Sequence, residues 1–151
     1  MELPLIYRGV GKKERRDLAR KALCKVGLEH RMDHKPSQMS GGQQQRVAIA
    51  RAIAQAPPVI LADEPTGNLD SGSTKEIMGI LKQLHEEGRT VILITHDNDI
   101  AAQARRVIRI KDGRVEADFE QDGGLSRSGC ILEKGVKMPF CGGMRGKDGR
   151  Y

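Results

Sequence analysis

Three short segments of the sequence carry residue types suited to handling a phosphorylated ligand. They are Ser40-Gly41-Gly42-Gln43, Asp63-Glu64 and Thr95-His96. A serine beside two glycines lets a helix start approach an anion closely. Adjacent carboxylates can hold a hydrated metal ion and polarise a water molecule, and a histidine can contact a terminal phosphate. Together the three segments indicate hydrolysis of a nucleotide phosphate.

Each segment taken alone also has an ordinary structural interpretation. Ser40 can be a simple N-cap after a flexible turn, and Asp63-Glu64 can be the polar end of a strand. The order and spacing of all three segments favour the functional interpretation.

A fourth segment, which would hold the nucleotide, is absent from the 151 residues. Nucleotide phosphates are commonly cradled by a loop of the form Gly-x-x-x-x-Gly-Lys-Ser/Thr. The sequence contains no such loop. The chain by itself is therefore expected neither to bind nor to hydrolyse ATP appreciably.

Apolar spacing predicts the helices that position the first segment. One helix is expected over 12–26, stopped by Gly27, and a second over about 43–54 with Ser40 as its N-cap. The amides at the start of the second helix would form an anion site.

Two continuous apolar runs, 59–62 and 91–94, predict strands buried on both faces of a parallel sheet. The sequence between them predicts a helix that is capped by Ser73 or a neighbour and stopped by Gly88. Residues 59–95 therefore form one β-α-β unit with parallel strands.

This unit is expected to bring the second and third segments together, because ligands bind at the carboxyl ends of parallel strands. Successive strand residues point to opposite faces, so Asp63 and Glu64 are expected to have separate tasks. We assign Asp63 to a Mg²⁺-bound water, Glu64 to polarising the attacking water and His96 to the terminal phosphate.

The rest of the chain divides at about residue 119. Residues 107–117 predict a closing hairpin around Asp112-Gly113, a pair that suits a type I′ turn. From residue 119 glycine becomes frequent and apolar periodicity is lost, so 119–151 is expected to be a mostly disordered tail.

Composition excludes several classes of function. The net charge is +6, but the excess of basic residues is concentrated in 1–35, and a solvated helix face explains it better than a nucleic-acid site. Three cysteines without a C-x-x-C pair support neither a disulfide framework nor a zinc site, and fit a reducing cytoplasm. No apolar run approaches the roughly 20 residues of a membrane span.

Four motifs of the sequence resemble those of a known family. Residues 38–46, Gln-Met-Ser-Gly-Gly-Gln-Gln-Gln-Arg, resemble the signature motif of ATP-binding-cassette (ABC) ATPases. Residues 60–65 resemble the Walker B strand, 67–70 the D-loop and 95–97 the switch histidine. The wording Ala-Asp-Glu-Pro-Thr-Gly-Asn-Leu-Asp is most similar to the macrolide-export and lipoprotein-release branch, and the likeness covers about residues 2–118.

The resemblance implies a fold and a division of the chain. The fold class is α/β, a partial P-loop NTPase (RecA-like) parallel sheet with an ABC-type helical subdomain. Residues 1–55 would be the helical subdomain with the signature motif, 56–118 the C-terminal part of the ATPase core and 119–151 a tail outside the family pattern. Because the family's Walker A loop and Q-loop precede the matching stretch, the chain is expected to be the C-terminal portion of a cassette.

The resemblance also implies partners and cofactors. Two cassettes of the family associate head to tail around two ATP molecules with Mg²⁺. The signature residues Ser40, Gly41, Gly42 and Gln43 would act on the partner's nucleotide, Asp70 would meet the partner, and Glu64 and His96 would act on the subunit's own nucleotide. The cassette would drive a membrane permease from the cytoplasmic face, with no nucleic-acid partner.

Two alternatives stay open. The chain could be a non-catalytic docking module that contributes only its signature face to an intact partner. It could also derive from a DNA-repair type of ABC ATPase, although the short spacing between the signature motif and the Walker B strand favours a transporter.

Overall fold

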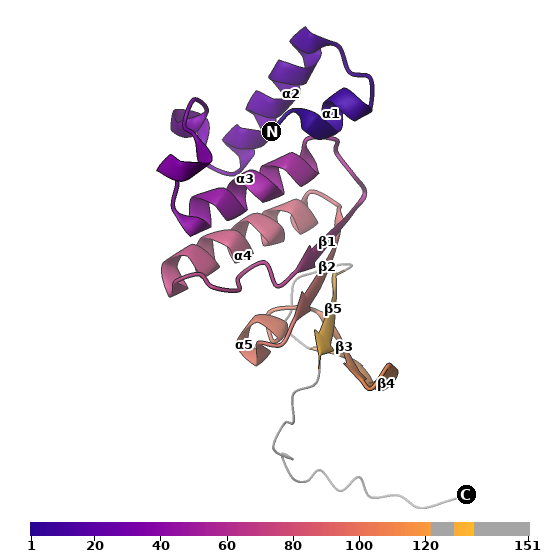
Figure 1. Ribbon diagram of the computed structural model, residues 1–151. Helices are drawn as coiled ribbons and strands as arrows, with labels where there is room; N and C mark the ends of the chain where they lie inside the picture. Colours follow the sequence, from indigo (N-terminus) through magenta and orange to yellow (C-terminus); the bar gives the residue numbers. More distant parts are fainter. Residues whose placement is uncertain (122–128, 135–151) are drawn as a thin grey trace, which may run out of the picture.

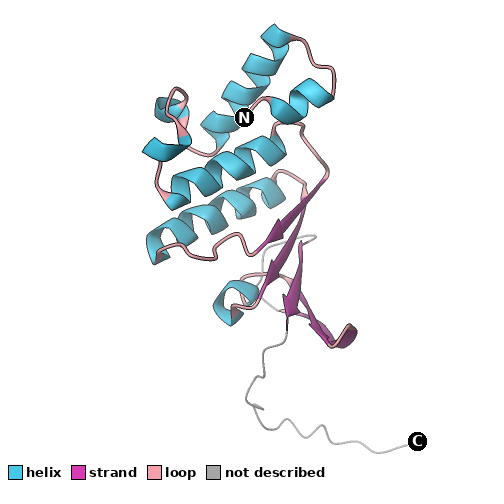
Figure 2. Ribbon diagram, viewed as in Figure 1, coloured by secondary structure: helices cyan, strands magenta, loops and turns pink. Residues whose placement is uncertain are grey.

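The computed structural model describes residues 1–121 and 129–134, and its elements are drawn in Figures 1 and 2. The first third of the chain is helical. Its elements are α1 (Leu3–Tyr7), α2 (Lys12–Lys25), two short 3₁₀ turns (Glu29–Arg31 and Pro36–Gln38) and α3 (Gly41–Ile53). The predicted helices over 12–26 and 43–54 are confirmed.

Strands and two further helices follow. They are β1 (Val59–Asp63), α4 (Ser71–Glu86), β2 (Thr90–Thr95), α5 (Asn98–Ala101), β3 (Arg106–Lys111), β4 (Arg114–Glu120) and β5 (Gly129–Lys134). The described strands form one sheet in the order β1-β2-β5-β3-β4. All neighbouring pairs are parallel except β3 and β4.

The predicted β-α-β unit is confirmed. β1 and β2 pair in parallel from Val59↔Thr90 to Asp63↔Ile94, and α4 makes the crossover between them. α4 ends as its sequence predicts, because Gly88 adopts φ +92 and the amides of Gly88 and Arg89 bond back to His85 and Leu84.

The three longer helices stack beside β1 and β2, with α4 between α3 and the strands (Figure 1). Apolar residues of the helices, of their connections and of the sheet form one core cluster, whose members include Leu5, Val26, Leu28, Ala50, Ile53, Ile60, Ile77, Leu81, Leu84 and Leu93. The boundary predicted near residue 55 falls in the connection between α3 and β1. The core cluster crosses this boundary, because it contains residues of both the helical part and the sheet.

The hairpin is also confirmed. β3 and β4 are antiparallel, and the two residues between them, Asp112 and Gly113, have φ of 50° and 73°. Positive φ at both central positions is the requirement of a type I′ turn.

The predicted tail boundary is wrong at two places. β4 continues to Glu120, because Arg106 donates two hydrogen bonds to Asp118 and the ladder runs on to Arg106↔Glu120. Residues 129–134 form β5, which lies between β2 and β3 and pairs in parallel with both. The unpaired backbone edges of β2 and β3 accept a strand whatever its local periodicity. The remaining tail residues, 122–128 and 135–151, lie outside the described part of the chain.

Candidate active site

Glu64 and His96 meet because each follows one of two adjacent parallel strands. Glu64 comes directly after β1 and His96 directly after β2. The Glu64 amide donates to the Ile94 carbonyl at 2.9 Å, which extends the β1–β2 ladder by one bond. The expected proximity of these two residues is confirmed.

The backbone of Glu64 sets the direction of its side chain. Its φ is +45°, a left-handed conformation that costs a non-glycine residue about 1–3 kcal/mol. Glu64 therefore lies past the regular strand, and the alternation of strand side chains does not govern it. Strained residues of this kind cluster at functional sites.

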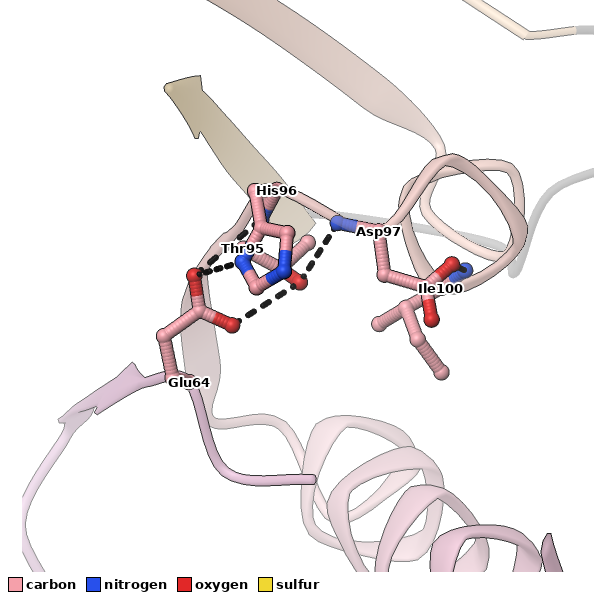
Figure 3. A network of polar contacts seen from close by, with 5 residues as sticks. All are labelled: Glu64, Thr95, His96, Asp97 and Ile100. Carbon is pink, nitrogen blue, oxygen red and sulfur yellow. Dashed lines mark hydrogen bonds and ion pairs between the residues drawn. The ribbon is translucent and has the colours of Figure 1, made fainter. Parts of the chain in front are cut away.

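The Glu64 carboxylate is bound to His96 by two contacts (Figure 3). Oε1 lies 2.7 Å from His96 Nδ1 and accepts the His96 backbone amide at 3.1 Å. A carboxylate only accepts hydrogen bonds, so Nδ1 carries the proton. The hydrogen bond that His96 Nδ1 donates to Glu64, followed by the negative charge of Glu64, raises the pKa of His96 above its ordinary value. The imidazole is largely solvent-exposed, at 72 %.

Thr95 belongs to this network, and no role was predicted for it from the sequence. Its hydroxyl accepts the Asp97 amide at 3.1 Å and donates to Glu64 Oε2 at 3.4 Å. Thr95 is fully buried, and Asp97 caps α5 through the amides of Asp99 and Ile100. The signal in the sequence that could have identified Thr95 is its place as a polar residue directly after the apolar run 91–94.

Asp63 ends β1 and is exposed. Among the described residues its carboxylate has no hydrogen-bond or salt-bridge partner, so it is available to a metal-bound water. Within that same part of the chain no three His, Cys, Asp or Glu side chains form a metal-binding group. A single available carboxylate fits a Mg²⁺ ion, which usually keeps several of its waters in protein sites.

The signature residues form the start of α3. Ser40 is its N-cap: Ser40 Oγ accepts the Gln43 amide at 3.3 Å, and Gln43 Oε1 accepts the Ser40 amide at 3.1 Å. Gly41 and Gly42 are the first two helical residues, and their amides are among those that a helix leaves unpaired. The start of α3 is thus a built helix terminus with a positive dipole end.

Asp70 is the N-cap of α4, three residues before Ser73, the residue at or near which the cap is predicted. Its carboxylate accepts the Ser73 amide at 2.9 Å and the Ser73 hydroxyl at 2.7 Å. The bond from the Ser73 amide, then that from its hydroxyl, lowers the pKa of Asp70. Its predicted contact with a partner stays a prediction.

The candidate residues therefore form two groups in one chain. Asp63, Glu64 and His96 lie at the ends of β1 and β2, and the signature residues lie at the start of α3. Residues 64–70 connect the end of β1 to the start of α4 (Figure 1). No hydrogen bond or ion pair between described residues joins the groups directly.

Across residues 1–121 and 129–134, no helix has both the length and the apolar character that a bilayer span requires.

Comparison with known proteins agrees with these features. Residues 4–67 match the ABC transporter family. The chain is 58% identical over 118 residues to the macrolide export ATP-binding/permease protein MacB 1 of Yersinia pestis, and 55% identical over 118 residues to MacB of Hyphomonas neptunium. Each alignment covers 78% of this chain and 18% of the relative.

Solved structures show the same likeness. A bacterial ABC transporter cassette, solved as a dimer, aligns with TM-score 0.68 at 50% identity and covers 81% of this chain. The same cassette bound to ADP and Pi after hydrolysis aligns with TM-score 0.68 at 49% identity. The chain spans 55% of that cassette. Its fold is thus that of an α/β P-loop NTPase cassette, and the chain belongs to the ABC transporter family, with the sequence of an ATP-binding cassette of the macrolide-export type.

Proposed function

We propose that this chain is the C-terminal part of a transporter ATPase that couples ATP binding and hydrolysis to movement of a substrate through a membrane permease. The contact between Glu64 and His96 carries the proposal, because it places a carboxylate and a protonated imidazole nitrogen 2.7 Å apart at the ends of adjacent parallel strands.

In this proposal Glu64 is the general base, and His96 and Thr95 hold it. The carboxylate would accept a proton from the attacking water. The His96 ring would give up its hydrogen bond to Glu64 and contact the terminal phosphate instead. Asp63 would hold the Mg²⁺ of ATP through a bound water. Bound Mg·ATP would supply the scissile phosphate bond, and its metal ion would neutralise charge on the phosphate oxygens.

The signature segment would act on a second nucleotide. The amides of Gly41 and Gly42, with Ser40 and Gln43, would receive the phosphates of ATP held by the partner's phosphate loop, and Asp70 would lie at the interface. The two groups lie on different elements, one at the ends of β1 and β2 and the other at the start of α3. This placement supports the arrangement, since each group can contact a separate nucleotide.

The chain spans 18% of the length of its curated relatives. Those relatives are named ATP-binding/permease proteins, and the solved cassette is described as dimeric. We therefore propose a permease partner, a head-to-tail second cassette and a location on the cytoplasmic face of the membrane.

One observation favours a second candidate, a non-catalytic docking module. The start of α3 is capped within this chain by the reciprocal hydrogen bonds of Ser40 and Gln43. This helix start can therefore be offered to an intact cassette that holds the nucleotide.

The catalytic role of Glu64 is tested in a cassette completed with the phosphate-loop segment of a macrolide-export relative. Glu64→Gln should lower ATP turnover by about 10²–10⁴-fold while ATP binding persists, because only the proton acceptor is lost. Steady-state turnover and nucleotide affinity are measured together, with the exposed Glu116→Gln as control. Turnover within a few fold of the parent would remove Glu64 as the base.

The docking role is tested with the 151-residue chain and an intact macrolide-export cassette. Association should require Mg·ATP, and Ser40→Arg should abolish it by placing bulk where phosphate approaches. Ser40→Ala is the matched control, because it loses the helix cap, at about 1 kcal/mol, without adding bulk. Analytical ultracentrifugation measures the complex, and equal binding by the Ser40→Arg variant would contradict this role.

A further inference from the structure

The start of α3 approaches the start of α4 more closely than two side-chain-bearing residues could. A Cβ atom added to Gly42 would lie 2.6 Å from Ser73 Oγ and 2.8 Å from Ser73 Cβ. Contacts below 3.0 Å are essentially never made by real Cβ atoms, so alanine at position 42 would force one helix to move. At Gly41 the same atom would meet Leu69 Cδ2 at 3.6 Å, an ordinary van der Waals distance.

Ser73 cannot turn away from this contact without loss. Its amide and its hydroxyl both donate to the Asp70 carboxylate, at 2.9 and 2.7 Å. Rotation of the hydroxyl would break the second bond, and it would leave Ser73 Cβ in place because the backbone fixes that atom. The side chain is therefore held against Gly42 from the α4 side.

A second contact keeps the two helices in register one turn further along. Arg46 Nη1 lies 3.3 Å from Glu76 Oε2, and the Arg46 side chain is 19 % exposed. Arg46 follows Gly42 by four residues and Glu76 follows Ser73 by three, so both pairs lie on the facing sides of α3 and α4.

Ser73, which is the α4 side of the contact with Gly42, is linked to Glu64 through Asp70 and a short hydrogen-bonded segment. The Gly67 amide donates to the Glu64 carbonyl at 3.1 Å, and the Leu69 amide donates to the Thr66 carbonyl at 3.3 Å. Leu69 also packs against the core cluster. The chain thus passes from Glu64 to Asp70 through bonded turns.

We propose that Ser73 is a positioning residue for the signature segment. Ser73 is held by two hydrogen bonds to Asp70 and packs against Gly42. These contacts would fix the position of the first amides of α3 relative to residues 64–70. This inference rests on the proposed function, in which those amides receive the phosphates of a partner's nucleotide. It gives Gly42 a second task, close approach to Ser73, besides close approach to a phosphate.

Second-site rescue in the full 151-residue chain tests the contact. The variants are Gly42→Ala, Ser73→Gly and their combination, and the readout is amide hydrogen exchange over residues 40–46 and 70–76. Gly42→Ala should raise exchange in both segments about tenfold or more, and adding Ser73→Gly should return it to within about twofold of Ser73→Gly alone.

Ser73→Ala combined with Gly42→Ala is the matched control, because it removes the hydroxyl and keeps the Cβ that would clash. It should not rescue exchange. Additive effects of Gly42→Ala and Ser73→Gly, or equal rescue by Ser73→Ala, would overturn the proposal. If Gly42→Ala alone yields no folded chain, the proposal still requires the Gly42→Ala/Ser73→Gly chain to fold, and its failure would overturn it.

A binding measurement separates positioning from a merely structural role. With Mg·ATP and an intact macrolide-export cassette, Ser73→Ala should weaken association about tenfold while exchange in β1 and β2 stays at parent rates. Parent-like affinity in Ser73→Ala would overturn the positioning role. Absence of binding by the parent would instead overturn the proposed action of the α3 amides on a partner's nucleotide, and the exchange experiment would still decide on the contact of Gly42 with Ser73.

Discussion

At the scale of single residues, the Glu64 carboxylate is the most constrained group of the candidate site. It accepts bonds from the His96 ring, the His96 amide and the Thr95 hydroxyl, and its own backbone is left-handed. A general base must be held within reach of its proton before its pKa matters. These contacts hold Glu64 in one orientation, and a ligand that draws His96 away would free one oxygen for water.

The pairing predicts a pH dependence for His96. Because Glu64 raises the pKa of His96 in the folded chain, the pair contributes stability that is complete below about pH 6.5, the unfolded value. That contribution is lost as pH rises through the raised folded pKa. NMR titration of the His96 ring should show a lower pKa in Glu64→Gln than in the parent. An unchanged titration would contradict the pairing.

At the scale of elements, the ends of the helices position the site. α3 begins at Ser40 and α4 begins at Asp70, each with a side-chain cap, and α4 stops at a left-handed glycine. These signals are local, so the helices start and stop where the sequence alone predicts, to within a few residues. The caps fix which amides each helix offers at its start.

Two glycines, one within α4 and one just beyond its C-terminal end, distinguish the effect of backbone conformation on stability from the effect of packing. Gly79 lies within α4, Gly88 lies just beyond it with φ +92, and a Cβ would meet nothing within 4 Å at either position. Gly79→Ala should stabilise the chain by about 0.5–1 kcal/mol through helix propensity. Gly88→Ala, the matched control, should destabilise it by about 1–2 kcal/mol. Denaturant unfolding measures both, and the same sign for both would contradict this account.

At the scale of the whole molecule, the described sheet presents an apolar surface along β1. Leu61 and Val59 are 64% and 49% exposed, although β1 pairs with β2 and its alternate residue Ile60 is buried against the helices. A sheet edge with exposed apolar side chains favours association with other chains. We therefore expect the isolated chain to self-associate.

The Leu61→Lys substitution tests this expectation. It should lower concentration-dependent association, because it places charge on the exposed face of the edge strand, and it should cost little stability at a position that is already 64% exposed. Light scattering across a concentration series measures the effect. Leu93→Lys is the contrasting control, since Leu93 is 3% exposed and should not tolerate charge. Unchanged association in the Leu61→Lys chain would contradict the prediction.

The sequence by itself determined most of the local structure and the identity of the candidate site. Caps, glycine stops, apolar runs and the Asp112-Gly113 turn each act over a few residues, so their types and spacing predict helices, strands and a hairpin. Parallel pairing of β1 and β2 follows from the crossover length, and it brings Glu64 to His96.

Only the tertiary structure decided what depends on contacts between distant segments. Residues 129–134 carry no clear periodicity, and they form β5 because β2 and β3 both offer unpaired edges. The left-handed backbone of Glu64, the buried hydroxyl of Thr95 and the approach of Gly42 to Ser73 are likewise set by packing across the fold. No local propensity encodes these distances, because each depends on two elements that meet only after the core has formed.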